Sequence, residues 1–108
     1  MMSNVDMLRL RPSCEHCDRG LPPHSEEAMI CSFECTFCRS CVEAVLFNVC
    51  PNCGGGFSQR PIRPRNNLKN NSCLEFHPAS TEVVYHPVDI DAHRAFSEKI
   101  KGIPPAER

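Results

Sequence analysis

Eight of the nine cysteines form four close pairs, and this spacing constrains the fold more than any other feature of the chain. Two thiolates that lie two or three residues apart on a tight turn can bind one metal ion at about 2.3 Å. Two such pairs complete a tetrahedral site, so the spacing predicts two metal ions. The pairs are Cys14/Cys17, Cys31/Cys35, Cys38/Cys41 and Cys50/Cys53.

The composition leaves little material for an ordinary hydrophobic core. The chain has 108 residues, 6% of them aromatic and none of them Trp, which suits one small domain with appendages. A structural zinc site contributes about 10–16 kcal/mol of apparent binding energy, which matches or exceeds the net stability of a typical domain. We therefore expect two Zn²⁺ ions to be part of the fold.

Disulfides are the alternative use of paired cysteines, for instance between Cys14 and Cys17 or between Cys50 and Cys53. They require an oxidising compartment, and the first eleven residues show no apolar signal segment. The longest apolar stretch near a helix, residues 42–47, is too short to span a bilayer. We expect a cytoplasmic protein without membrane contact, whose thiolates bind metal.

The order of the pairs bears on which of them share an ion. Neighbouring pairs can combine, or the first can combine with the third and the second with the fourth. Only two residues separate Cys35 from Cys38, and such a connector, extended at about 3.3 Å per residue, runs from one ion to another about 14 Å away. We therefore favour the interleaved arrangement. It gives a first site of Cys14, Cys17, Cys38 and Cys41 and a second of Cys31, Cys35, Cys50 and Cys53.

The chain divides into four segments by composition. Residues 1–13 form an N-terminal arm, 14–57 the binuclear zinc module, 58–71 a basic Arg/Pro linker and 72–108 a C-terminal extension. In the module we expect a short strand over residues 28–30 and one short helix between Cys41 and Cys50, with Ser40 as its cap. The prediction is a small metal-stabilised α+β fold.

Two further elements are expected in the extension. Residues 82–85 favour a strand. Residues 89–101 favour an amphipathic helix with Ala92, Phe96 and Ile100 on its apolar face, which we expect to dock on the zinc module.

The cysteine order resembles the cross-brace of RING-type zinc fingers, a treble-clef-like arrangement. Residues 14–53 match it, including Pro51 after the seventh ligand and Phe37 before the fifth. The chain departs from RING domains at Cys35, where they commonly have His, and at Gly54, where ligases often have a basic residue. It also lacks their groove Trp, and Glu and His replace the usual apolar residue inside the first pair. The resemblance implies the scaffold, and the departures disfavour ubiquitin-ligase activity.

A second resemblance spans most of the chain. Residues 30–38, the C-P-N-C-G-G turn, the Arg/Pro segment and the H-P-A-S-T stretch at 77–81 resemble a family of small bacterial proteins of unknown function, family twelve seventy-two. This resemblance implies a bacterial cytoplasmic setting and lends no activity.

Two closed all-cysteine sites leave no open metal position, so we expect no enzyme but a scaffold that binds another protein. One alternative is nucleic-acid binding through the basic 60–69 segment. An iron electron carrier is another, because the Cys50 turn resembles the rubredoxin loop, although the aromatic core of rubredoxin is missing. Cys73 and the histidines are expected to have no ligand role. The basic residues of the segment are Arg60, Arg63, Arg65 and Lys69.

Overall fold

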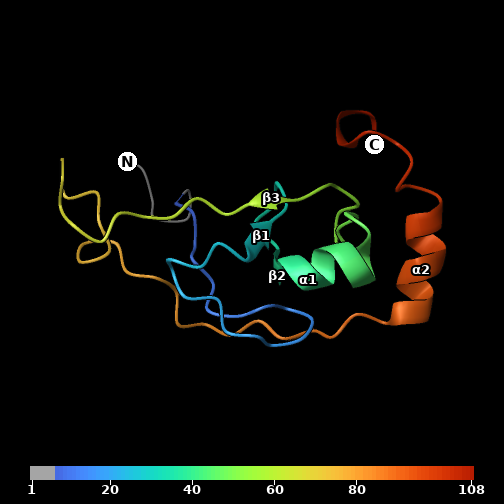
Figure 1. Ribbon diagram of the computed structural model, residues 1–108, viewed down its shortest axis with the longest axis horizontal. Helices are drawn as coiled ribbons and strands as arrows, with labels where there is room; N and C mark the ends of the chain where they lie inside the picture. Colours follow the sequence, from blue (N-terminus) through green and yellow to red (C-terminus); the bar gives the residue numbers. More distant parts are fainter. Residues whose placement is uncertain (1–6) are drawn as a thin grey trace.

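The computed structural model describes residues 7–108, and a three-stranded antiparallel sheet lies at its centre (Figure 1). The strand order is β2-β1-β3, with Ala28 opposite Cys38 and Met29 opposite Gln59. The strand expected over residues 28–30 is confirmed. The turn between β1 and β2 carries the second cysteine pair. The strands are β1 (Ala28–Ile30), β2 (Thr36–Cys38) and β3 (Ser58–Gln59).

A short helix follows β2 directly. Helix α1 (Arg39–Cys41) continues into a wider π-helical turn, η2 (Val42–Leu46), so the helix expected before Cys50 is confirmed. The predicted Ser40 cap is wrong, because the helix begins after Cys38 and has no side-chain cap. It ends where Phe47 and Asn48 adopt left-handed conformations with φ of 54° and 58°. Asn tolerates this conformation better than most residues, which explains the stop.

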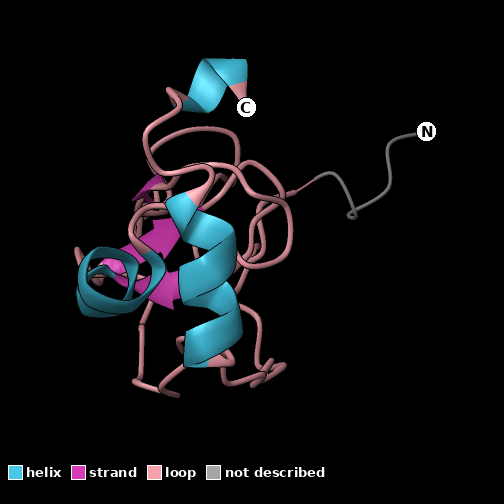
Figure 2. Cartoon of the chain, turned by 90° about the vertical axis from the view of Figure 1, so that its right-hand side faces the viewer, coloured by secondary structure: helices cyan, strands magenta, loops and turns pink. Residues whose placement is uncertain are grey.

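The second helix, α2 (Ile90–Glu98), confirms the helix expected in the extension, although it is shorter than residues 89–101. The Asp89 carboxylate caps it by accepting a 3.0 Å hydrogen bond from the Ala92 N–H. The helix lies beside η2 (Figures 1 and 2). His93 and Ser97 are its buried side chains, whereas Ala92 and Phe96 remain exposed. Phe96 and Ile100 of the predicted apolar face nevertheless lie against the turn at Gly54, within 4 Å of the position that a Cβ on Gly54 would take. The docked face therefore combines part of the predicted apolar face with His93 and Ser97.

The strand expected over residues 82–85 is wrong, because these residues form no ladder with any strand of the described chain. The outer edge of β2 is already occupied there by Glu15, whose N–H donates to the Thr36 carbonyl at 3.0 Å. The segment before α2 contacts this edge through the His86 N–H, which donates to the Glu15 carbonyl at 2.8 Å, and through the Val88 N–H, which donates to Nδ1 of His16 at 2.9 Å. A strand needs a ladder partner, and the available one is taken.

The C-terminal residues return to the cysteine-rich module of residues 14–57. After η3 (Pro105–Glu107), Nη1 of Arg108 donates to the carbonyls of Asn48 and Gly54 at 2.8 and 3.1 Å. At the other end, residues 1–6 of the predicted arm lie outside the described residues, while Leu10 is buried. None of the helices in the described part is both long and apolar enough to cross a membrane.

The core is small and contains several of the cysteines. Phe37 is its largest apolar side chain, and its ring meets that of Phe57 edge-on at 5.5 Å. A core of this size gives only marginal stability by apolar burial alone. Three of its nine buried members are cysteines, so sulfur forms part of the interior. The buried members of this cluster are Cys14, Leu21, Ala28, Met29, Phe37, Cys38, Cys41, Val42 and Leu46.

Candidate metal centres

The first sulfur group contains Cys14, Cys17, Cys38 and Cys41. Their four Sγ atoms all lie within 4.8 Å of one another, and Sγ of Cys17 is 3.8 Å from Sγ of Cys38. A tetrahedral ion with metal–sulfur bonds of about 2.3 Å has sulfurs about 3.8 Å apart, so the group has the dimensions of a metal site. Cys17 is exposed and the other three are buried. These four residues could hold one metal ion.

The second sulfur group contains Cys31, Cys50 and Cys53, whose Sγ atoms also lie within 4.8 Å of one another. Cys35 stands at its edge. Its Sγ accepts a 3.4 Å hydrogen bond from the Asn52 side-chain amide but does not lie within 4.8 Å of all three other sulfurs. The group could hold a second ion. Along the chain the two groups alternate, as the connector between Cys35 and Cys38 led us to expect.

Backbone amides point at the sulfurs from the turns that carry them. The amides of Phe33, Asn52 and Gly55 lie 3.3, 3.4 and 3.4 Å from the Sγ atoms of Cys31, Cys50 and Cys53. These donors stabilise a thiolate more than a thiol. Gly54, with φ of +80°, provides the left-handed conformation that the turn after Cys50 and Cys53 requires.

The thiols of the second group differ in proton affinity. A hydrogen bond from Cys50, together with one from Asn52, lowers the pKa of Cys35 to about 5, and the same interaction raises the pKa of Cys50. Burial raises the pKa of Cys31 to about 11. A bound metal ion would displace the remaining protons, because thiolate is the ligand form.

Glu15 joins the loop of residues 11–22, which contains Cys14 and Cys17, to the sheet. It was not anticipated as a structural residue. Its carboxylate is buried, and Oε2 accepts hydrogen bonds from Arg11 Nη1 at 2.6 Å and from the Thr36 N–H at 2.7 Å. The only sequence signal was Arg11 four residues earlier. The contact fixes Cys14 and Cys17 relative to β2.

Other residues singled out from the sequence lie apart from both groups. Cys73 belongs to neither and is fully buried. Nδ1 of His16 accepts a 2.9 Å hydrogen bond from the Val88 N–H, and Nε2 of buried His93 lies 3.0 Å from the Leu46 carbonyl. His24 and His86 are exposed. The first two histidines thus have roles in packing.

The basic segment is partly incorporated into the fold. Arg60 is buried, and Arg63 is half-buried with its two terminal nitrogens donating to the carbonyls of His77 and Leu8. Arg65 and Lys69 are exposed. Two of the four cations thus donate to backbone carbonyls.

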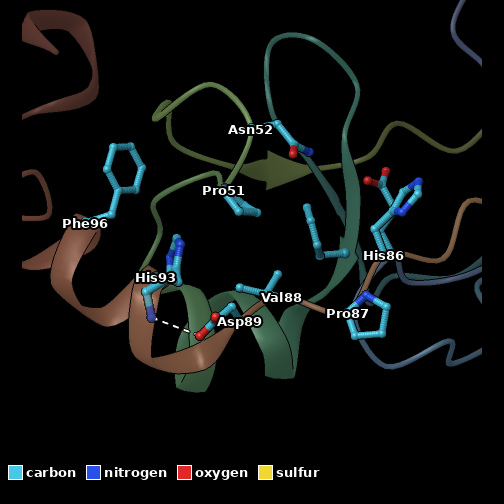
Figure 3. Close-up of a pocket in the computed structure, with 11 residues that line it drawn as sticks. Pro51, Asn52, His86, Pro87, Val88, Asp89, His93 and Phe96 are labelled. Carbon is cyan, nitrogen blue, oxygen red and sulfur yellow. Dashed lines mark hydrogen bonds between the residues drawn. The ribbon is translucent and has the colours of Figure 1, made fainter.

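A cavity of about 400 Å³ lies between the turn of residues 50–53, residues 86–89 and helix α2 (Figure 3). Its apolar walls include Phe37, Pro51, Val88 and the exposed ring of Phe96. Glu15 and Asp89 are its charged lining residues. The remaining lining residues are Asn52, His86, Pro87, Ala92 and His93.

These observations define a small α+β protein whose two cysteine groups could hold metal ions. Residues 7–63 match the family model described as "Protein of unknown function (DUF1272)". The chain is also 53% identical over 89 residues to the uncharacterized protein R02474 of Rhizobium meliloti (strain 1021), a match that covers 82% of this chain and 99% of that protein. The chain belongs to this family, as its resemblance predicted. No solved structure matches it.

Proposed function

We propose that this protein binds two structural Zn²⁺ ions on a RING-like, treble-clef-like cross-brace. The observation that supports the proposal is the alternation along the chain of two sulfur groups, one of four cysteines and one of three cysteines with Cys35 beside it, because four thiolates make a tetrahedral site. The ligands are Cys14, Cys17, Cys38 and Cys41 at the first site and Cys31, Cys35, Cys50 and Cys53 at the second.

A closed four-thiolate site supplies folding energy and leaves no position for a reacting water. We therefore assign the protein no enzymatic activity. Four thiolates also accept iron. Among the described residues, the buried cluster contains Phe37, with Phe57 packed against it. This small aromatic content favours zinc as a structural substitute for apolar burial over iron as an electron carrier.

The proposed role is a cytoplasmic scaffold that binds another protein at the cavity beside α2. The occupant that fits is an apolar side chain flanked by Lys or Arg. Its apolar walls and the exposed Phe96 ring suit such an anchor, and its exposed charged lining residue, Asp89, is acidic, whereas the Glu15 carboxylate is buried and already paired with Arg11. A four-thiolate Zn²⁺ site adds about two negative charges nearby. Nucleic-acid binding has less support, because Arg60 and Arg63 donate to backbone carbonyls.

Metal binding is tested by native mass spectrometry with elemental analysis, before and after treatment with a strong chelator. We expect two zinc ions per chain, and loss of far-ultraviolet circular dichroism when they are removed. Protein that contains no metal and keeps its structure in chelator would overturn the proposal. Coloured protein with stoichiometric iron would reassign the metal.

Partner binding is tested with a displayed peptide library and two matched variants of α2. Ala92→Arg fills the cavity, whereas Ala95→Arg adds the same side chain to an exposed position of α2 that is not part of the cavity lining. We expect selected peptides to contain an apolar residue beside basic ones, and to bind Ala95→Arg but not Ala92→Arg. Equal binding to both variants would exclude the cavity. Oligonucleotide binding that falls steeply with salt and requires Arg65 and Lys69 would favour the alternative.

A further inference from the structure

The most deeply buried charged group in the described part of the chain is the guanidinium of Arg60. Its side chain is 1% exposed and is the largest of the fully buried side chains. Nη1 donates to the carbonyl of Arg11 at 2.9 Å, and Nη2 donates to the carbonyls of Leu21 and Pro22 at 3.2 and 3.0 Å. Nε has no partner. The acceptors of its hydrogen bonds are all backbone carbonyls, and all lie within residues 11–22.

The three acceptors lie on the two sides of one closed loop. Residues 11–22 form what we call the first cysteine loop, with Cys14 and Cys17 near its tip. Its two sides are joined by a 2.8 Å bond from the Leu21 N–H to the Pro12 carbonyl and by the bridge between Ser13 and Gly20. Arg60 therefore fastens the base of the loop from both sides at once.

The backbone of Arg60 belongs to the sheet that carries the other half of the first site. Arg60 follows β3, and its N–H donates to the Ala28 carbonyl at 2.8 Å. Ala28 in turn lies opposite Cys38 in the pairing of β1 with β2. Arg60 thus connects the loop of Cys14 and Cys17 to the strand that ends at Cys38.

We propose that Arg60 is the positioning residue of the first metal site, holding the first cysteine loop at the correct distance from Cys38 and Cys41. This inference rests on the proposed function, since it concerns the same metal site. A planar guanidinium offers several donors in one rigid arrangement, which a lysine ammonium does not. It therefore fixes the spacing of three carbonyls, where a flexible side chain would not.

The charge of Arg60 fits the same role. The ion pairs found within residues 7–108 do not include it, and burial lowers its pKa. A buried charge that lacks a counter-charge is strongly unfavourable. Four thiolates around a divalent ion carry a net charge of about −2, so the loaded site supplies the missing opposite charge within the same module.

The test compares three substitutions in the metal-loaded, full-length protein. Arg60→Met removes the guanidinium. Arg63→Met removes a guanidinium that donates to the carbonyls of His77 and Leu8, away from the cysteine loop. Arg65→Met removes an exposed cation. We expect Arg60→Met alone to weaken the first site by about 10–100-fold, the usual effect of losing an outer-shell partner, and to leave the second site unchanged.

Two readouts separate positioning from a general loss of stability. Competition with a chromogenic chelator gives the affinity of each site. Maleimide labelling then shows which site is empty, because Cys17 and Cys53 are the exposed members of the two groups. Preferential labelling of Cys17 in Arg60→Met supports the proposal. Equal weakening of both sites, or of neither, overturns it.

Arg60→Lys provides the decision if Arg60→Met does not fold. This variant keeps the charge but loses the planar arrangement of donors. We therefore expect a smaller weakening, again confined to the first site, and a change in the absorption spectrum of the Co²⁺-substituted protein. Wild-type spectra and affinity in Arg60→Lys, or equal loss at both sites, would refute the proposal. Wild-type protein without metal would instead refute the proposed function, so the two failures are distinguishable.

Discussion

Replacing Cys38 by Ser tests whether the first sulfur group holds the module together. Cys38 is 2% exposed, pairs with Ala28 in the sheet and has its sulfur 3.8 Å from that of Cys17. A structural zinc site contributes about 10–16 kcal/mol, whereas the net stability of a domain is about 5–15 kcal/mol. Loss of one ligand should therefore unfold the module.

Cys73→Ser is the matched control, because it makes the same chemical change at a second buried position. Cys73 is 0% exposed and lies outside both sulfur groups. A buried hydroxyl without a partner costs about 1–3 kcal/mol, and each kcal/mol lowers the melting temperature by about 4–8 °C in a domain of this size. We expect a moderate shift and full metal content.

Native mass spectrometry and thermal melts followed by circular dichroism distinguish the two variants. Cys38→Ser should lose at least one zinc ion and its cooperative transition, whereas Cys73→Ser should keep both ions. If Cys38→Ser kept two ions and melted alongside the control, the assignment of cysteines to sites would be wrong.

Two further substitutions test contacts around the first cysteine loop and α2. Glu15→Gln replaces the buried carboxylate that binds Arg11 and the sheet, and should cost about 1.5–3 kcal/mol in urea unfolding. Glu27→Gln, which breaks an exposed ion pair, should cost under about 1 kcal/mol, and equal losses would contradict the assigned role of Glu15. Asp89→Ala removes the cap of α2 and should cost about 1 kcal/mol, seen as faster amide exchange in the first turn. Asp91→Ala, in the same turn but not at the cap, should have a smaller effect, and the reverse order would contradict the capping contact.

The features that the sequence predicted are those with a local cause. The cysteine pairs, the strand at residues 28–30 and the helix that begins after Asp89 each depend on the spacing of a few neighbouring residues. The start of α1 was less predictable, because Ser40 suits a cap but the chain enters the helix directly from β2. The capping preference of Ser40 was therefore overridden, because the extended backbone of β2 places the helix start directly after Cys38.

The features that were missed depend on contacts between distant segments. Periodicity predicted a docked face of Ala92, Phe96 and Ile100. It missed the buried His93, whose Nε2 lies 3.0 Å from the Leu46 carbonyl. The Leu46 carbonyl, at the end of η2, also accepts a hydrogen bond from the Val49 N–H at 3.0 Å, so His93 adds a second polar contact there that periodicity does not reveal. Arg60 is the same case. A cation in an Arg/Pro segment favours a solvated linker, and nothing local indicates three carbonyls about 40 residues or more away.

The order in which the chain leaves the ribosome gives the alternating sulfur groups a further consequence. All four members of the first group have emerged once Cys41 is made, whereas the second group must wait for Cys53, twelve residues later. Metal insertion can therefore proceed in a fixed temporal sequence. If the groups hold metal as proposed, Cys31 and Cys35 would wait during that interval for Cys50 and Cys53 to complete their site.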